Sequence, residues 1–228
     1  MPPPAPPRSP KLKKKHSASS ARWLRRQLSD PYVTEAKRLG YRSRAAFKLI
    51  ELDDRFRLLK PGAKVVDLGA APGGWSQVAV ARVRPETSRG AVVAVDIAGL
   101  EPIAGAETLG ADVFAPDLPE LVRQHLRGPA DVVLSDMAPS ASGHPGADHL
   151  RIVGLAEAAA EVAMAVLAPG GSFVCKVWQG GTTRELLALL KRRFATVRHA
   201  KPPASRAESA EVYVVATGFR PDEGEPGR

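Results

Sequence analysis

The sequence predicts an α/β fold: a doubly wound, mostly parallel seven-stranded sheet with an antiparallel last strand. Two observations lead to this prediction. Short apolar runs alternate with helical patterns along most of the chain, which is typical of a parallel sheet with helices on both faces. The last apolar run, Glu211–Thr217, follows a loop and lacks the crossover helix that usually precedes a parallel strand, so we expect it to be antiparallel.

The individual elements follow from hydrophobic periodicity. In residues 43–56, one apolar stripe contains Leu49 and Leu52, and Lys48 lies off it. The segment Ala168–Gly171 (APGG) is a helix stop signal. We expect strands at Lys64–Leu68, Ala91–Val95, Asp131–Ser135, Ser172–Trp178 and Glu211–Thr217, and a further strand that ends near Asp112. We expect helices at Ala21–Leu39, Ser43–Phe56, Gly74–Arg82, Pro116–Leu126, Ala147–Leu167 and Thr182–Arg193.

Composition favours one folded domain with short extensions. The 228 residues are 44% hydrophobic and 25% charged, which is ordinary for a globular protein. Residues 1–20 are rich in proline, then in lysine and serine, and cannot bury a core, so we expect a disordered arm. We place the folded domain at 21–220 and a flexible tail at 221–228.

Charge and residue usage narrow the function classes. The formal net charge of +9 indicates a polyanionic partner such as an RNA backbone. The single cysteine, Cys175, excludes an internal disulfide and a cysteine-cluster metal site, and we expect it in the core. No apolar run reaches the ~18 residues of a membrane span, and the N-terminus lacks a signal-peptide core. We therefore expect a cytosolic protein that is a monomer and needs no protein partner.

The strongest local signal is the turn in Val65–Ser76 (VVDLGAAPGGWS), which joins a buried strand to a helix. Gly69, Gly73 and Gly74 allow a ligand to approach the backbone closely, and the helix N-terminus offers free N–H groups to an anion. The glycine spacing of dinucleotide-binding proteins is absent, and Asp67 precedes the first glycine by two residues. S-adenosylmethionine suits this arrangement, because its carboxylate needs N–H donors and its amino group needs an acceptor.

Acidic residues after the next strands can complete this cofactor site. Asp96 or Glu101 can accept hydrogen bonds from the ribose or adenine, and Asp112 can meet the adenine amino group. Each of these carboxylates can instead form or cap a turn. Their occurrence together with the glycine turn favours the cofactor interpretation.

Charged residues from four segments are expected to meet at one edge of the sheet. Ligands of open parallel sheets lie at the carboxyl ends of the strands, where Asp136 follows one strand and Lys176 nears the end of another. An antiparallel last strand begins at that same edge with Glu211, and Lys48 can reach it from the preceding helix. A lysine within so apolar a strand as that of Lys176 is costly unless it is paired or functional.

A group of two lysines and two acids suits methyl transfer to a ribose hydroxyl. An alcohol is a poor nucleophile until it loses its proton, and a lysine can take or steer that proton when burial or a neighbouring cation lowers its pKa. Carboxylates can hold the lysines in position. A surface cluster of ion pairs is the simpler interpretation, and the apolar surroundings of Lys176 argue against it.

At these residues the chain resembles the FtsJ family of bacterial ribosomal RNA large-subunit ribose 2′-O-methyltransferases. The resemblance extends from about Ser43 to Gly218, and several long motifs occur in the family's order. These motifs are SRAAFKL at 43–49, DLGAAPGGWSQ at 67–77, SDMAPS at 135–140, KPPASR at 201–206 and EVYVVATG at 211–218.

The resemblance implies a Rossmann-like methyltransferase fold that uses S-adenosylmethionine, and a uridine of 23S rRNA in the assembling large ribosomal subunit as its substrate. It also implies a catalytic tetrad of Lys48, Asp136, Lys176 and Glu211, in which Lys176 acts on the 2′-hydroxyl. At position 101 the family pattern has Asp, which changes the reach of the side chain by one methylene group. The implied cofactor contacts are Gly73, Trp75, Glu101, Asp112 and Asp136.

Several alternatives share parts of this pattern. A tRNA 2′-O-methyltransferase would have the same tetrad, whereas a non-catalytic RNA-binding assembly protein would be expected to have lost part of it. A nicotinamide-dependent oxidoreductase is disfavoured by the glycine spacing. Basic residues on the first two helices can form a rim that binds RNA phosphates: Arg25, Arg26, Lys37, Arg38, Arg42 and Arg44.

Overall fold

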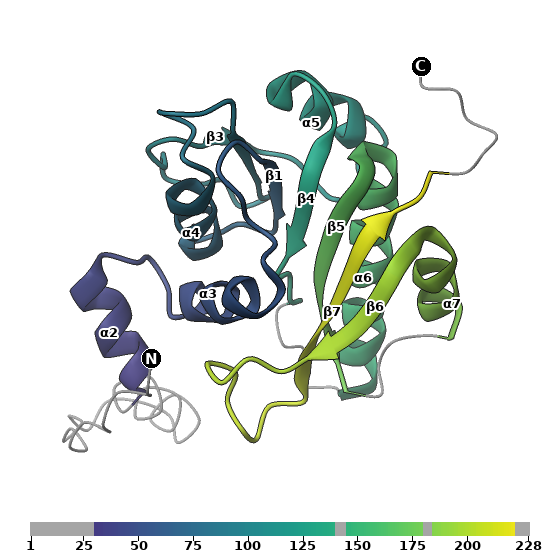
Figure 1. Ribbon diagram of the computed structural model, residues 1–228. Helices are drawn as coiled ribbons and strands as arrows, with labels where there is room; N and C mark the ends of the chain where they lie inside the picture. Colours follow the sequence, from purple (N-terminus) through teal and green to yellow (C-terminus); the bar gives the residue numbers. More distant parts are fainter. Residues whose placement is uncertain (1–29, 140–144, 180–183, 222–228) are drawn as a thin grey trace.

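The structure is a computed structural model that describes residues 30–139, 145–179 and 184–221 (Figure 1). The predicted arm at 1–20 and residues 222–228 of the predicted tail lie outside these ranges. The same is true of the first part of the helix expected at 21–39, of which the structure describes α2 at Pro31–Leu39. The domain boundaries at 21 and 220 therefore remain predictions.

The core of the molecule is a seven-stranded sheet with the order β3-β2-β1-β4-β5-β7-β6 (Figure 1). The pairs from β3 to β5 are all parallel, and β7 runs antiparallel to both β5 and β6. This confirms the predicted fold class and the direction of the last strand. The strands are β1 Lys64–Leu68, β2 Ala91–Val95, β3 Glu107–Leu109, β4 Ala130–Ser135, β5 Leu167–Trp178, β6 Phe194–Ala200 and β7 Glu211–Phe219.

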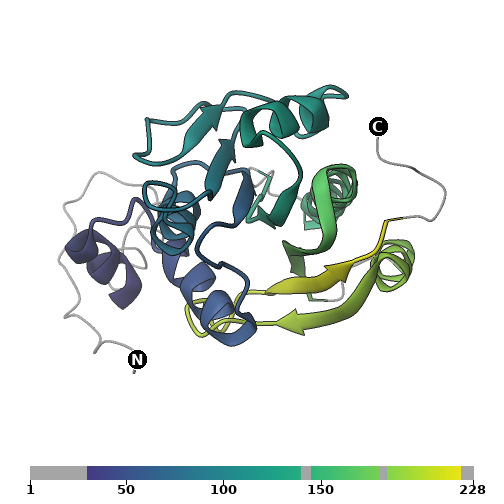
Figure 2. The ribbon, with the colours of Figure 1, turned by 45° about the horizontal axis from the view of Figure 1, so that its top comes forward.

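Helices cover both faces of the sheet (Figures 1 and 2). Alternate residues of β1 enter opposite halves of the core, with Val65 packed among residues of α3 and α4 and Val66 among residues of α5 and α6. Two-sided burial explains why the central strands are almost continuously apolar. The remaining helices are α3 Ala45–Phe56, α4 Gly74–Val83, α5 Leu118–Leu126, α6 Pro145–Val166 and α7 Arg184–Arg193.

Two predicted strand boundaries were wrong. The strand expected to end near Asp112 is β3, which ends at Leu109. Strand β5 begins at Leu167 and not at Ser172, so the helix stop signal at 168–171 lies inside a strand. The reason is an irregularity in the pairing with β4: Ala130 lies opposite Leu167 while Val132 lies opposite Ser172, so the extra residues bulge out of β5.

Strand β6 was not among the predicted ranges. Its sequence, FATVRHA, has buried residues only at its two ends, Phe194 and Ala200, and lies at the edge of the sheet. An edge strand with little burial gives a weak period-two pattern. Cys175 is buried as predicted. None of the helices within the described ranges is long and apolar enough to cross a membrane.

Candidate active site

The fold brings the four predicted catalytic residues to one edge of the sheet. Asp136 directly follows β4, and Lys176 lies near the end of β5. In the antiparallel pairing of β5 and β7, Glu211 lies opposite Trp178, so the start of β7 is at the same edge. Helix α3 lies beside this edge and supplies Lys48 (Figure 1).

Ion pairs link the four side chains in a chain of alternating charge. Lys48 Nζ lies 2.7 Å from Glu211 Oε1 and 3.9 Å from Asp136 Oδ2. Lys176 Nζ lies 3.2 Å from Asp136 Oδ1 and donates a hydrogen bond of 2.5 Å to the backbone oxygen of Asp136. Asp136 therefore joins the two lysines. Only 7% of Lys48 and 8% of Lys176 are exposed, which excludes the simple surface cluster.

Two further residues belong to this cluster and were not predicted as members of the site. Tyr213 lies opposite Lys176 in the β5–β7 pairing, and its hydroxyl donates a hydrogen bond of 2.6 Å to Asp136 Oδ1. The Ser205 hydroxyl donates one of 2.8 Å to Glu211 Oε1. Both lie in sequence motifs that were recognised, but their contacts depend on the strand register and on the loop at 201–206.

Burial and charge set the protonation of the site. Burial acts to raise the pKa of Glu211, but the Lys48 ammonium and hydrogen bonds from Lys48 and Ser205 outweigh it, and the pKa is lowered. The pKa of Tyr213 lies well above its ordinary value, first because of burial and then because of the negative charges of Asp136 and Glu211. The carboxylate of Glu211 is thus ionised at neutral pH, and the Tyr213 hydroxyl keeps its proton as a donor.

A cavity of about 360 Å³ opens beside the tetrad at the carboxyl ends of β1, β2 and β4. Three of the predicted cofactor residues, Gly69, Asp112 and Asp136, line this cavity, as does Asp96. A carboxylate thus follows each of β2 and β4. Its other lining residues are mostly apolar: Leu68, Ala71, Val95, Ile97, Ala111, Val113, Met137, Ala138 and Leu155.

Four predicted cofactor residues do not line the cavity. Asp67 is 1% exposed and accepts a hydrogen bond of 2.6 Å from Ser76 Oγ. The Trp75 side chain is buried and donates from Nε1 to the backbone oxygen of Ala45. Gly73 is the N-cap of α4. The Glu101 side chain is exposed, and its backbone oxygen accepts a hydrogen bond of 2.7 Å from Arg42.

Asp96 occupies the place expected of Glu101. It follows β2 directly, and its carboxylate accepts hydrogen bonds from the backbone N–H groups of Ala71, at 2.9 Å, and Ala98, at 2.8 Å. It therefore holds the glycine-rich turn while facing the cavity. Between Asp96 and Glu101 the sequence left the choice open, and the end of β2 at Val95 favours Asp96.

The predicted basic rim is largely engaged within the protein. Arg38 pairs with Glu35, and Arg44 pairs with Asp30 at 2.9 Å. Arg42 donates hydrogen bonds to the backbone oxygens of Pro72, Glu101 and Pro102, and so ties the cofactor turn to the loop after β2. The Lys37 side chain makes no hydrogen bond or ion pair with the described part of the chain. Arg25 and Arg26 lie outside the described residues.

Comparisons with known proteins identify the family of this chain. The family described as "FtsJ-like methyltransferase" matches residues 41–219 of the sequence, which are more than half of the chain. The chain belongs to the FtsJ-like methyltransferase family. Ribosomal RNA large subunit methyltransferase E of Paramagnetospirillum magneticum is 62% identical over 212 residues, which are 92% of this chain and 87% of that protein. Its namesake in Acidiphilium cryptum is 57% identical over 93% of this chain and 92% of that protein.

A solved structure shows the same architecture. The crystal structure of a Plasmodium falciparum protein described as a ribosomal RNA methyltransferase has a TM-score of 0.69 and 28% sequence identity. The match covers 78% of this FtsJ-like chain and 98% of the Plasmodium chain.

As an FtsJ-like methyltransferase, the protein uses S-adenosylmethionine as methyl donor. The cavity beside the tetrad fits this cofactor in size and chemistry. Its volume lies within the range of small-molecule sites, its walls are largely apolar, and its carboxylates can accept hydrogen bonds from amino and hydroxyl groups. The carboxylates of Asp96 and Asp112 flank it on one side, and Asp136 joins it to the tetrad.

Proposed function

We propose that this enzyme methylates the ribose 2′-hydroxyl of a uridine in 23S rRNA of the large ribosomal subunit or its precursor. The observation that carries the proposal is the buried Lys48–Asp136–Lys176–Glu211 cluster beside the cofactor cavity. The printed names of relatives over 55% identical, which refer to large-subunit ribosomal RNA, support the choice of RNA.

In this proposal Lys176 is the residue that acts on the hydroxyl. When bound, S-adenosylmethionine supplies an electrophilic methyl group on a sulfonium. Lys176 Nζ would hydrogen-bond the 2′-hydroxyl and accept its proton, so that the ribose oxygen could receive the methyl group that the cofactor supplies. Asp136 fixes Lys176 through its carboxylate and its backbone oxygen, so the nitrogen has one orientation.

The other members of the cluster position this pair. Lys48 neutralises Asp136 and Glu211, and Glu211 holds Lys48 at 2.7 Å. The Tyr213 hydroxyl donates to the same Asp136 oxygen that meets Lys176. Tyr213 therefore helps to fix the orientation of the Asp136 carboxylate that meets Lys176.

For the cofactor we infer that Asp96 and Asp112 receive the ribose and adenine donors, and that the turn at 69–73 receives the methionine portion. Asp67 would then act through Ser76 and the turn rather than by contact. We also infer that residues 21–220 form the methyltransferase domain and that the enzyme works in the cytoplasm as a monomer. The family match at 41–219 and an rRNA substrate support these inferences.

The direct test is incubation with methyl-labelled S-adenosylmethionine and 50S subunits from a strain that lacks this modification. We expect label in 23S rRNA and none in tRNA added to the same reaction. Label in tRNA alone would favour a tRNA methyltransferase, and binding without any label would favour a non-catalytic assembly factor. Lys176→Ala should still bind the cofactor but transfer at least a hundredfold more slowly. Turnover at the wild-type rate would remove Lys176 from its proposed role.

A further inference from the structure

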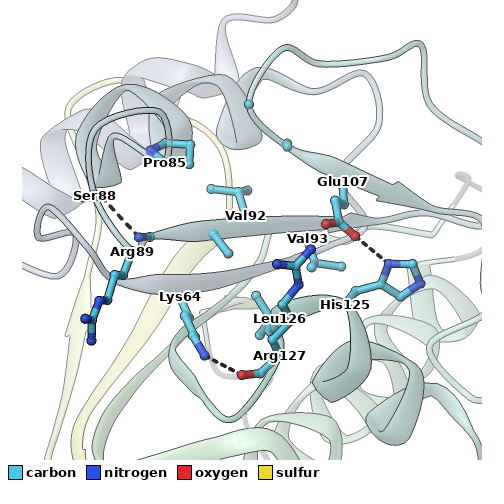
Figure 3. A pocket seen from close by; sticks show the side chains of 14 residues that line it. Lys64, Pro85, Ser88, Arg89, Val92, Val93, Glu107, His125, Leu126 and Arg127 are labelled. Carbon is cyan, nitrogen blue, oxygen red and sulfur yellow. Dashed lines mark hydrogen bonds and ion pairs between the residues drawn. The ribbon is translucent and has the colours of Figure 1, made fainter.

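A second cavity lies where β1, β2 and β3 begin, at the opposite end of the strands from the tetrad, and Figure 3 shows the residues that line it. Its volume is about 660 Å³, and the first residues of three strands line it: Lys64 of β1, Ala91 of β2 and Glu107 of β3. Strand β3 pairs only with residues 93–95 of β2. The first two residues of β2 therefore have no strand beside them on that side, which leaves room for the cavity.

The cavity combines an apolar floor with positive charge. Val92, Val93 and Leu126 form apolar parts of its lining. Lys64, Arg89 and Arg127 also line it, against one acidic residue, Glu107, whose carboxylate lies 2.7 Å from His125 Nδ1 (Figure 3). The Lys64 ammonium donates a hydrogen bond to the backbone oxygen of Arg127.

The two arginines have no partner for their charge. Arg89 and Arg127 are exposed, and neither guanidinium group makes a hydrogen bond or ion pair with any described residue. Arg84, which precedes the lining residue Pro85, is also exposed, and its guanidinium group makes no hydrogen bond or ion pair with any described residue. Most arginines at the catalytic edge are engaged, as Arg42 and Arg44 illustrate.

Two of the arginines at or beside the cavity are helix C-caps. Arg84 and Arg127 are the C-caps of α4 and α5 and adopt the left-handed conformation, with φ of 53° and 54°. Glycine is favoured there because a side chain is strained in this conformation. Helix dipoles attract cations, but the last turns already contain Arg82 in α4 and Arg123 in α5.

We infer that this cavity, with its lining arginines Arg89 and Arg127 and the adjacent Arg84, forms a second RNA-binding surface that holds backbone phosphates of the rRNA. The inference rests on the proposed function, because it takes rRNA as the substrate. Guanidinium groups bind phosphate oxygens in pairs, and structured RNA is recognised largely through shape and phosphates. The two edges are separated by the length of a five-residue strand, about 16 Å. The surface would therefore grip a different segment of RNA from the one that enters the active site.

The test is a variant with Arg89→Gln and Arg127→Gly, compared with a matched control, Arg57→Gly with Arg192→Gln. Arg57 is also an exposed left-handed C-cap, with φ of 56°, and neither control residue lines the cavity. Both variants lose two positive charges, and both place glycine where glycine is favoured. Each should melt at or above the wild-type temperature, so a binding defect would not reflect misfolding.

Binding to unmodified 50S subunits should weaken at least tenfold in the cavity variant and less than twofold in the control. The dependence of log Kd on log salt should become shallower by about one to two units in the cavity variant alone. KM for the subunits should rise in parallel while kcat and the affinity for S-adenosylmethionine stay unchanged. Equal binding by the two variants would overturn the inference. Because binding is measured without turnover, a wild-type protein that binds through the cavity but does not methylate would contradict only the proposed function.

Discussion

Asp96 and Glu101 illustrate how a few residues of chain decide a cofactor contact. Both are acids in the loop after β2, but Asp96 directly follows the strand and lines the cavity, whereas the Glu101 side chain is exposed. The same Asp96 carboxylate accepts a hydrogen bond from Ala71 in the glycine-rich turn. Its removal should therefore affect both the ligand and the turn that contacts it.

We predict that Asp96→Ala weakens the binding of S-adenosylmethionine at least tenfold, because a charged hydrogen-bond acceptor is worth about 1.5–3 kcal/mol. Glu101→Ala serves as the matched control and should change the affinity less than threefold. Isothermal titration calorimetry of the two variants measures both values. A larger loss in Glu101→Ala would restore the contact that the family resemblance implies.

The carboxyl group of Asp67 is buried without a complete set of hydrogen-bond partners. Ser76 donates to Oδ2, whereas Oδ1 has no hydrogen-bond partner. Burial, and then the negative charges of Asp136 and Asp96, raise the pKa of Asp67 from 3.8 to about 7, although the hydrogen bond from Ser76 opposes this. The folded state thus binds this proton more tightly than the unfolded state. The stabilisation is present at low pH and is lost as pH rises from about 4 to about 7.

Asp67→Asn should abolish this loss, because an amide stays neutral at all these pH values. The free energy of unfolding of the variant, relative to the wild type, should therefore increase between pH 5 and pH 8. Urea denaturation at the two pH values measures the change. A difference between variant and wild type that is the same at both pH values would contradict the shifted pKa.

The sequence was sufficient to predict that Lys48, Asp136, Lys176 and Glu211 lie together, because strand ends and motifs mark them, but it left the choice between Asp96 and Glu101 open. It was not sufficient to predict Tyr213, since the contact of its hydroxyl with Asp136 depends on how β7 pairs with β5. Arg42 was expected to bind RNA, but its guanidinium group donates to three backbone oxygens. An exposed position between two helices does not reveal such a long-range contact.

At the scale of elements, the turn between β1 and α4 depends on close packing as well as on backbone freedom. Gly69 has a φ of 72°, and a Cβ atom at this position would overlap Met137, which lines the cofactor cavity with it. Gly40, at the end of α2, has almost the same φ of 75° but no atom within 4 Å of such a Cβ. Comparing substitutions at the two glycines therefore distinguishes the cost of backbone strain from the cost of steric overlap.

We predict that Gly40→Ala lowers the free energy of unfolding by about 1 kcal/mol, the cost of a side chain in the left-handed region. Gly69→Ala should lower it by about 2–4 kcal/mol, because overpacking adds to the same backbone cost. Gly69→Ala should also weaken cofactor binding, since Met137 must move. Equal destabilisation of the two variants would show that Met137 yields without cost.

Elements buried on two sides were easier to predict than elements at the margins. The apolar runs of β1, β2 and β4 were placed within one residue of their observed bounds. The start of β5 was missed because APGG at 168–171, an ordinary helix stop, here continues into a bulged strand. Strand β6 at the edge has only Phe194 and Ala200 buried, so hydrophobic periodicity could not indicate it.

In the whole molecule, the two ends of the parallel strands carry different cavities. The carboxyl edge brings together cofactor cavity and tetrad, and this arrangement could be predicted because parallel strands all end on that side. The opposite edge holds the larger, basic cavity, which no motif marks. The guanidinium groups of Arg89 and Arg127 there have no partner among the described residues. An enzyme whose substrate is a ribosomal particle can use both edges, because that substrate is larger than the protein.

We propose that the tetrad catalyses methylation of a ribose 2′-hydroxyl in 23S rRNA. The most direct measurement is mass spectrometry of nucleosides from 23S rRNA of unmodified 50S subunits after incubation with S-adenosylmethionine and either the wild-type enzyme or Lys176→Ala. We predict 2′-O-methyluridine from the wild type and almost none from the variant. A methyl group on a base, or equal amounts of 2′-O-methyluridine from both proteins, would contradict the account.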